Sequence, residues 1–145
     1  EIKRHIGYVS PEMNRVYLKN LPALDIVASG LFDTVGLFMH ATPAQLESCR
    51  EWMRTFGIGG LAARPYLQLS SGEQRLGLLA RAFVKEPDLL ILDEPMHGLD
   101  PDNCARVKEI IDTYMQRPHR TLVMVSHYES ELPACIGRRL TLSRN

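Results

Sequence analysis

The apolar run Leu-Leu-Ile-Leu at residues 89–92, followed directly by Asp93 and Glu94, is the feature that most constrains the fold. A continuous apolar run of this length is typical of a strand that is buried on both faces of a parallel sheet. Its carboxyl end delivers two acidic side chains, and that is the edge at which α/β sheets bind ligands. We therefore predict a strand here with a functional site at its end.

Helices are predicted before and after this strand from their start signals. Thr42 precedes Pro43 and stands three residues before Gln45, which is a capping-box pattern, and Asp100 precedes Pro101 as an N-cap. The other expected elements are strands at 5–10, 121–125 and, more weakly, 139–142, and helices within 21–39 and after 69–74. Strands that alternate with helices predict an α/β fold with a mostly parallel sheet.

Composition excludes several classes of protein. Lys and Arg (17) balance Asp and Glu (17), so the basic excess of a nucleic-acid-binding protein is missing and we expect no nucleic-acid partner. The content of 45% hydrophobic and 23% charged residues argues against intrinsic disorder. The three cysteines, Cys49, Cys104 and Cys135, are far apart and odd in number, as in reduced cytosolic proteins. No apolar run approaches the roughly 18–20 residues that span a bilayer.

The acidic pair suits phosphoryl transfer. That chemistry needs one carboxylate to hold magnesium and another group to orient the attacking water. Asp93 suits the metal and Glu94 the water. The alternative is that both acids only cap a turn, and an isolated Asp-Glu pair would favour this alternative.

A second candidate site lies at residues 69–74, directly before a predicted helix. Free backbone N–H groups and the helix dipole make a helix start an anion site. Gly72 allows a phosphate to approach the backbone, and Ser70 adds a hydroxyl donor. The alternative is an ordinary Ser70 N-cap with Glu73 in the first turn. The position of this helix start, about twenty residues before the acidic pair, favours a shared function.

These segments together resemble the ATP-binding-cassette (ABC) ATPases. Residues 69–101 resemble the signature motif, the Walker B strand and the D-loop of that family, residues 125–127 resemble its switch histidine, and residues 6–9 resemble the strand that enters its Q-loop. The resemblance implies a P-loop NTPase (RecA-like) parallel-sheet core, here partial, with an inserted α-helical subdomain. Residues 1–20 and 87–145 would belong to the core and residues 21–86 to the helical subdomain.

The resemblance also implies the cofactors ATP and Mg²⁺ and a role for single residues. His127 would hydrogen-bond the γ-phosphate. The contacts to the γ-phosphate of ATP held by a partner domain would come from Ser70, Ser71, Gly72 and Glu73.

The remaining implied roles concern metal, water and the dimer. Asp93 would bind magnesium, through water, and Glu94 would polarise the attacking water. Asp100 would lie at the dimer interface in the D-loop. The glutamine expected in the Q-loop falls on Pro11, which has no side-chain ligand, so Glu12 is the nearest substitute as a metal ligand.

The phosphate-binding loop of the family, G-x-x-x-x-G-K-[ST], is not found in these 145 residues. Ser71 also replaces the first glycine of the usual signature. Because the family carries that loop upstream of the Q-loop strand, and because the chain starts without methionine inside an expected strand, we expect a portion of a longer protein that is inactive alone.

In the intact protein, the resemblance implies ATP hydrolysis between two such domains, as a homodimer or a tandem, and work with transmembrane permease subunits at the inner, cytoplasmic face of the membrane. Residues 9–12, 29–37 and 126–136 look most like tandem ATP-binding proteins named for molybdate transport, so molybdate is the expected solute. Two alternatives stay open: a soluble, non-transport ABC ATPase of DNA repair or translation, and a regulatory module that binds nucleotide without turnover. The Asp93–Glu94 pair and His127 argue against the second.

Overall fold

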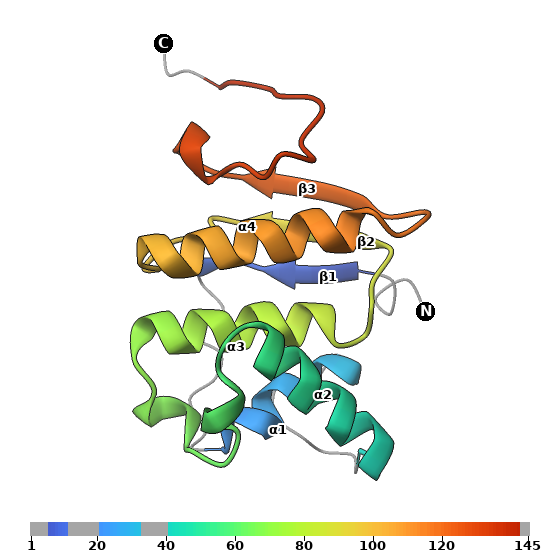
Figure 1. The fold of residues 1–145 in the computed structure, drawn as a ribbon, viewed down its shortest axis with the longest axis vertical. Helices are drawn as coiled ribbons and strands as arrows, with labels where there is room; N and C mark the ends of the chain where they lie inside the picture. Colours follow the sequence, from blue (N-terminus) through green and yellow to red (C-terminus); the bar gives the residue numbers. More distant parts are fainter. Residues whose placement is uncertain (1–5, 12–20, 33–40, 143–145) are drawn as a thin grey trace.

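One parallel sheet organises the chain, whose structure is a computed structural model that describes residues 6–11, 21–32 and 41–142. Its strands are β1 (Ile6–Val9), β2 (Leu89–Asp93) and β3 (Thr121–Val125), in the order β1-β2-β3 (Figure 1). The register pairs Val9 with Leu92, and Asp93 with Val125. The carboxyl ends of all three strands therefore lie at one edge, and the prediction of an α/β fold with a parallel sheet is confirmed.

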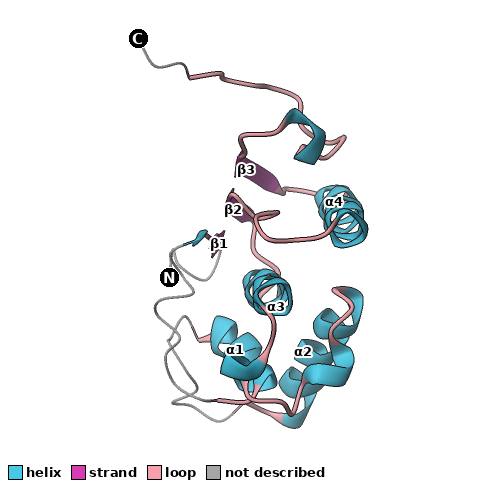
Figure 2. Cartoon of the chain, turned by 90° about the vertical axis from the view of Figure 1, so that its left-hand side faces the viewer, coloured by secondary structure: helices cyan, strands magenta, loops and turns pink. Residues whose placement is uncertain are grey.

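Four α-helices accompany the sheet in the described structure. They are α1 (Ala23–Ala28), α2 (Pro43–Thr55), α3 (Ser71–Phe83) and α4 (Pro101–Met115), with short 3₁₀ turns at Ser29–Leu31, Gly59–Leu61, Tyr66–Gln68 and Glu129–Glu131. Helix α3 packs against β1 on one side and against α1 and α2 on the other (Figure 1). Helices α3 and α4 both lie on the same side of the sheet (Figure 2).

The helix starts follow the predicted cap chemistry. The Thr42 hydroxyl accepts a hydrogen bond from the Gln45 N–H at 3.1 Å, and the Gln45 side chain accepts one from the Thr42 N–H at 2.8 Å. Asp100 caps α4 by accepting from the Asn103 N–H at 2.7 Å. Gly57 follows α2 with a φ of 81°, a left-handed conformation that glycine adopts without strain. These local signals are confirmed.

An aromatic cluster joins three helices. The ring of Phe83 on α3 meets Tyr114 of α4 at a centroid distance of 4.9 Å and Trp52 of α2 at 5.2 Å. Phe56 packs on Phe83 from the end of α2 at 5.4 Å. The Phe83–Tyr114 and Phe56–Phe83 pairs are edge-to-face, and such contacts add about 0.5–1.5 kcal/mol per pair beyond the buried area. The cluster fixes α2 and α4 relative to α3.

Helix α3 runs antiparallel to β1 at very short distance. A Cβ atom on Gly7 would lie 2.6 Å from the carbonyl oxygen of Ala82, so only glycine allows the approach. Toward the other end of the helix, Arg75 reaches the carbonyl oxygen of Ser10. The N-terminus of α3 consequently points to the same edge of the sheet as the carboxyl ends of the strands.

The sheet differs from the expectation in its burial. Leu90 and Leu92 are fully buried, whereas Val123 is 49% and Tyr8 46% exposed on the opposite face. The predicted burial of the 89–92 run on both faces is therefore wrong for the described part of the chain, because α3 and α4 cover one face only. The predicted strand at 139–142 is also wrong: these residues pair with no strand in the described part of the chain, and Leu140 is 86% exposed.

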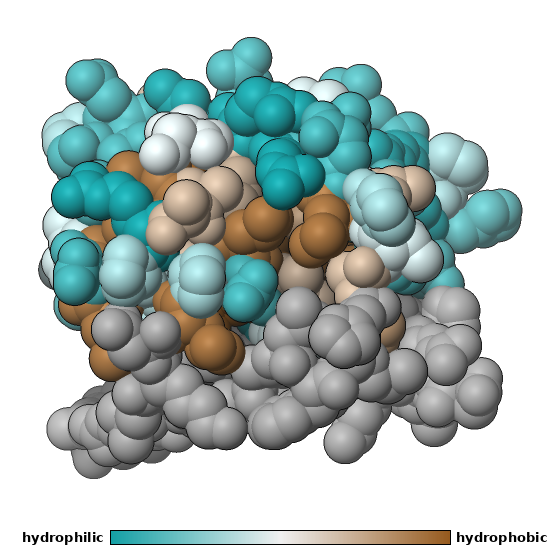
Figure 3. All heavy atoms as spheres, turned by 90° about the horizontal axis from the view of Figure 1, so that it is seen from below, coloured by the Kyte–Doolittle hydropathy of each residue, from teal (hydrophilic) through white to brown (hydrophobic). Residues whose placement is uncertain are grey.

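The helical end of the molecule presents a mixed surface, where apolar side chains reach the surface between polar ones (Figure 3). Within the residues that the structure describes, no helix has the length and apolar character needed to cross a membrane.

Candidate functional site

The carboxyl edge of β2 and β3 brings three of the predicted residues together. Asp93 is the last residue of β2 and pairs with Val125, the last residue of β3. The backbone N–H of Glu94 then donates to the Val125 carbonyl at 2.9 Å. This hydrogen bond places Glu94 beside the segment that carries His127. Because β2 and β3 are parallel, the residues that follow them lie at the same edge of the sheet.

Glu94 has an unusual backbone conformation. Its φ of 52° lies in the left-handed region, which costs a residue other than glycine about 1–3 kcal/mol. The conformation is held by the bond to Val125 and by the His97 N–H, which donates to the Glu94 carbonyl at 3.2 Å. Strain of this kind concentrates at functional sites, where it fixes the direction of a side chain.

The Glu94 carboxylate faces His127. Its Oε1 atom lies 2.9 Å from Nε2 of the imidazole, and the Glu94 side chain is 17% exposed against 80% for His127. The two groups are not aligned for a hydrogen bond, and no residue in the described ranges donates a hydrogen bond to the buried Oε1 atom. A buried carboxylate oxygen without a donor is rare, and it leaves an acceptor available to a water molecule.

Asp93 is available to a cation. Its carboxylate is partly buried, and no side chain in the described ranges pairs with it. Across residues 6–11, 21–32 and 41–142, no three His, Cys, Asp or Glu side chains gather into a metal cluster. This arrangement fits Mg²⁺, which is usually held by one or two carboxylates together with substrate phosphates and water rather than by a full protein cage.

The signature segment, which we define as Ser70 to Glu73, forms the start of α3. The Ser70 hydroxyl accepts from the Glu73 N–H at 3.1 Å, and the Glu73 carboxylate accepts from the Ser70 N–H at 2.9 Å. Both polar side chains thus form a capping box, as the simpler of the two alternatives expected. The first N–H groups of the helix, on Ser71 and Gly72, have no intrahelical partner and remain donors for an anion.

The turn that precedes α4 lies against the signature segment. A Cβ atom on Gly72 would be 3.4 Å from the carbonyl oxygen of Gly98 and 3.9 Å from Leu99. Asp100 follows this turn, is exposed, and uses one carboxylate oxygen as the cap of α4. The structure therefore brings the signature segment next to residues 98–100.

Some predicted residues are not brought together. The signature segment makes no hydrogen bond or ion pair with Asp93, Glu94 or His127 in the described structure, although both groups lie at the same edge of the sheet. Glu12, the substitute metal ligand, lies outside the described residues.

Sequence reasoning missed Arg75, which is only 2% exposed and lies two residues after the signature segment. The available signal was its spacing from the apolar residues Leu78, Leu79 and Ala82, which puts the arginine on a buried helix face.

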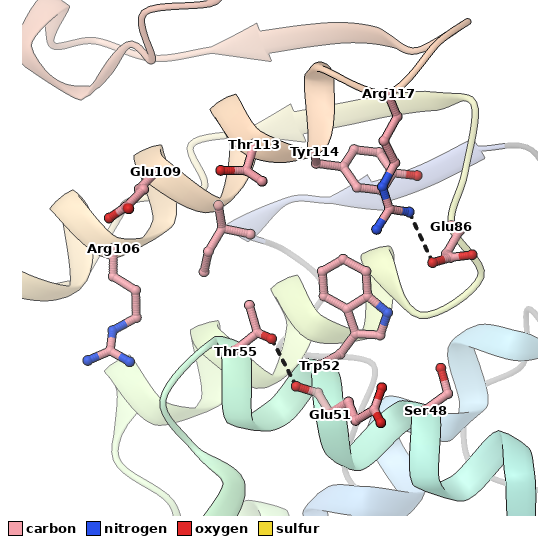
Figure 4. Close-up of a pocket in the computed structure, with 11 residues that line it drawn as sticks. Ser48, Glu51, Trp52, Thr55, Glu86, Arg106, Glu109, Thr113, Tyr114 and Arg117 are labelled. Atoms are coloured by element: carbon pink, nitrogen blue, oxygen red, sulfur yellow. Dashed lines mark hydrogen bonds and ion pairs between the residues drawn. The ribbon is translucent and has the colours of Figure 1, made fainter.

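A cavity of about 520 Å³ lies away from this edge, between α2 and α4. Trp52 and Tyr114 line it, and Arg117 closes one end through its ion pair with Glu86 at 3.0 Å (Figure 4). None of the predicted site residues lines this cavity. The groups predicted to bind magnesium and phosphate are not in this cavity, since the two carboxylates and the first N–H groups of α3 lie at the sheet edge.

Comparison with known proteins identifies the family. The family model described as ABC transporter matches residues 1–97. The chain is 39% identical over 141 residues to the ABC transporter ATP-binding protein ModF of Escherichia coli K12, covering 97% of this chain and 29% of ModF. It is 35% identical over 128 residues to the Fe(3+) ions import ATP-binding protein FbpC of Brucella melitensis, covering 77% of this chain and 36% of FbpC.

The fold agrees with this result. The dimeric structure of MJ0796, a bacterial ABC transporter cassette, superimposes with a TM-score of 0.77 at 22% identity, covering 89% of this chain and 55% of that one. The chain spans well under two thirds of the relatives and of this cassette. Since the family model matches most of its length, the chain belongs to the ABC transporter family as part of an ATP-binding domain.

Proposed function

We propose that the complete protein hydrolyses Mg-ATP at the interface of two ABC ATPase domains and thereby energises transport across a membrane. One observation carries the proposal: the buried Oε1 of Glu94, without a donor, next to His127 and one residue after Asp93. Family membership supports it, because the ATP-binding domains of this family supply the energy for transporters.

In this proposal, Glu94 orients the attacking water. Water adds to the γ-phosphorus while the bond to the oxygen that bridges the β- and γ-phosphates breaks, which yields ADP, inorganic phosphate and a proton. Glu94 suits the role because its acceptor oxygen is fixed by a strained backbone and lacks another donor. His127, which is mostly exposed, donates to the γ-phosphate. Asp93 holds Mg²⁺ through water, and the ion neutralises charge on the phosphates when it is bound.

The signature segment acts on the ATP of a partner domain. Ser71 and Gly72 offer their free N–H groups at the start of α3, and the helix dipole favours an anion there. Ser70 and Glu73 keep these groups in place through the capping box. Asp100 belongs to the same interface, because the turn before it contacts Gly72.

We propose the division of the chain that the family resemblance implies. Residues 1–20 and 87–145 belong to the nucleotide-binding core and residues 21–86 to the helical subdomain. The partners of the complete protein would be a second ABC ATPase domain, in a homodimer or a tandem, and transmembrane permease subunits. The protein would lie at the cytoplasmic face of the membrane. Molybdate is our proposed solute, because residues 9–12, 29–37 and 126–136 look most like the ATP-binding proteins named for molybdate transport.

The test of hydrolysis uses the complete protein and its Glu94→Gln variant. We expect Mg-ATP-dependent phosphate release by the wild type and a loss of about 10²–10⁴-fold in the variant, as for a general base, with ATP binding retained. Glu109→Gln is the matched control, because Glu109 is an exposed glutamate of α4 away from the site. A Glu94→Gln protein that releases phosphate at the control rate would refute the assignment.

The solute requires a separate measurement. Cells that lack the gene should take up less molybdate at limiting concentration, and the wild-type gene should restore uptake while Glu94→Gln should not. Normal molybdate uptake with defective iron or zinc uptake would keep the transport function and change the solute. Normal uptake of all three would favour a non-transport ATPase.

Glu12 is proposed as a ligand of Mg²⁺ in place of the expected glutamine, since Pro11 offers no side-chain ligand and Mg²⁺ accepts carboxylate oxygens. The Glu12→Ala variant of the complete protein should need a several-fold higher magnesium concentration for half-maximal hydrolysis. An unchanged magnesium curve would remove Glu12 from the site and leave Asp93 as the carboxylate ligand.

A further inference from the structure

Arg75 is a buried cation. It is 2% exposed, its Nη1 atom donates to the Ser10 carbonyl at a long 3.3 Å, and its Nε atom is buried without a hydrogen-bond acceptor among the described residues. Burial lowers the pKa of the guanidinium, and the nearby Tyr66 side chain acts in the opposite direction. Arginine nevertheless stays charged near neutral pH, so this site carries a desolvation penalty that packing alone does not explain.

The acceptor is a particular carbonyl. Ser10 follows the last residue of β1 that pairs with β2, so its carbonyl lies beyond the ladder and is buried. Arg75 gives this oxygen a charged donor, and hydrogen bonds from charged groups contribute more than neutral ones. Pro11 follows and restricts the backbone further. Arg75 therefore fixes the end of β1.

Two consecutive residues of α3 hold the helix to two different parts of the molecule. Gln74 donates to the Tyr66 carbonyl at 3.1 Å, and the Tyr66 hydroxyl donates to the Gln74 carbonyl at 3.3 Å, which ties α3 to the turn at Tyr66–Gln68. Arg75 ties the same helix to β1, across 65 residues of sequence. Both ties lie directly after the signature segment.

We propose that Arg75 is a positioning residue that holds the signature segment in register with the end of β1. Contact between the signature segment and a phosphate would then be transmitted to the backbone at Ser10 and Pro11, and movement there would displace the signature segment. The inference rests on the proposed function, because it assigns Arg75 to the same ATPase site.

The position of Arg75 on α3 allows it to move the signature segment. Arg75 lies one helical turn from Ser71 and Gly72, the residues with free N–H groups, so a shift of its anchor moves those donors. At the other end of α3, Gly7 allows the helix to pack closely on β1, since a Cβ there would lie 2.6 Å from the Ala82 carbonyl oxygen. A misplacement of about 1 Å at a reacting group can lower a rate on the order of 10²-fold.

The test compares Arg75→Met with Arg81→Met in the complete protein. Methionine has a similar length and no charge, and replacing a buried charge by an apolar side chain is often neutral or stabilising. We expect Arg75→Met to melt at or above the wild-type temperature, with kcat lower by about 10- to 100-fold and KM for Mg-ATP changed by no more than about twofold. Arg81 is the matched control, because it lies on α3 but bonds the Ser29 hydroxyl at 3.0 Å rather than β1.

A double-mutant cycle separates positioning from loss of packing. If Arg75 acts through the signature segment, its effect on kcat should be non-additive with that of Ser70→Ala, whereas independent effects add. Wild-type kcat in Arg75→Met, or strict additivity, overturns the inference. Should Arg75→Met fail to fold, the Arg75→Lys variant decides: lysine keeps the charge but lacks the planar fork, so a folded, fully active Lys variant overturns it and a folded, slowed one supports it.

The wild type separates this inference from the proposed function. If the wild-type protein releases no phosphate from Mg-ATP, the proposed function has failed. If it is active and Arg75→Met is equally active, the ATPase site stands and only the role of Arg75 is lost.

Discussion

The imidazole Nε2 atom of His127 lies 2.9 Å from Oε1 of Glu94, across the boundary between β2 and β3. The two residues come from the ends of different strands, so their approach depends on the sheet rather than on local sequence. The contact is close but not aligned as a hydrogen bond, since Oε1 remains without a donor. A water molecule beside the pair could donate a hydrogen bond to Oε1, which accepts none from the described residues.

From this geometry we predict the effect of His127→Ala in the complete protein. Removing one donor to a developing phosphate charge should lower kcat by about 10²–10³-fold with nucleotide binding largely kept. Because both residues act on one reacting group, the double variant with Glu94→Gln should be little slower than Glu94→Gln alone. His97→Ala is the control, an exposed histidine in the turn after β2. A His127→Ala enzyme as fast as this control would contradict the assignment.

A second prediction concerns Gly72 in the signature segment. Gly72→Asp would place a carboxylate where the partner's γ-phosphate is expected, so phosphate release should fall by at least about 10²-fold while ATP still binds. Gly72→Ala is the matched control, since its Cβ would meet the Gly98 carbonyl at 3.4 Å without adding charge. Equilibrium binding and phosphate release are measured in parallel. Equal activity of the two variants, or loss of ATP binding in the mutated domain's own site, would contradict the proposed contact.

A third prediction concerns the chain of 145 residues by itself. Its lysines, Lys3, Lys19, Lys85 and Lys108, each follow a residue other than glycine, so a G-K phosphate loop is missing from this stretch. Without that cradle of backbone N–H groups, the purified chain should bind Mg-ATP very weakly and release no phosphate. The background is set by the Glu94→Gln form of the same chain. Steady-state release above that background would show that the phosphate loop is dispensable.

Local chemistry made most helices predictable. Three helix starts are predicted by cap residues that lie within four residues of each other. These are Thr42 with Gln45, Ser70 with Glu73, and Asp100, and the structure contains all three caps. The meeting of Glu94 with His127 was foreseeable from topology, because both follow strands of a parallel sheet.

Long-range features were not predictable in this way. The φ of Glu94 and the Arg75–Ser10 bond depend on packing between segments far apart in the sequence. The prediction that residues 89–92 are buried on both faces was wrong for a related reason. An apolar run indicates that a strand can be buried on both faces, but the segments that cover those faces lie elsewhere in the sequence. The run at 139–142 has strand-like residues but no neighbour to pair with among those described.

The last prediction concerns Tyr114, which links α4 to the segment before β2. Its buried hydroxyl donates to the Pro87 carbonyl at 2.5 Å. Tyr114→Phe leaves that buried carbonyl without a donor and should lower the free energy of unfolding by about 1–3 kcal/mol near pH 7. Urea denaturation of the chain, followed by circular dichroism, measures the difference. Tyr128→Phe, at a tyrosine that is 65% exposed, is the control.

The same variant has a pH signature. Burial raises the pKa of the Tyr114 hydroxyl, an effect that Arg120 and Arg117 partly oppose. The folded state therefore retains the proton more strongly than the unfolded state, so this stabilisation is complete below the unfolded pKa of about 10 and declines as pH rises above it. The stability advantage of wild type over Tyr114→Phe should shrink between pH 9 and 11, taken as roughly one unit on either side of that pKa. An advantage that is constant or grows over this range would show that the hydroxyl ionises as easily in the folded state as in the unfolded chain.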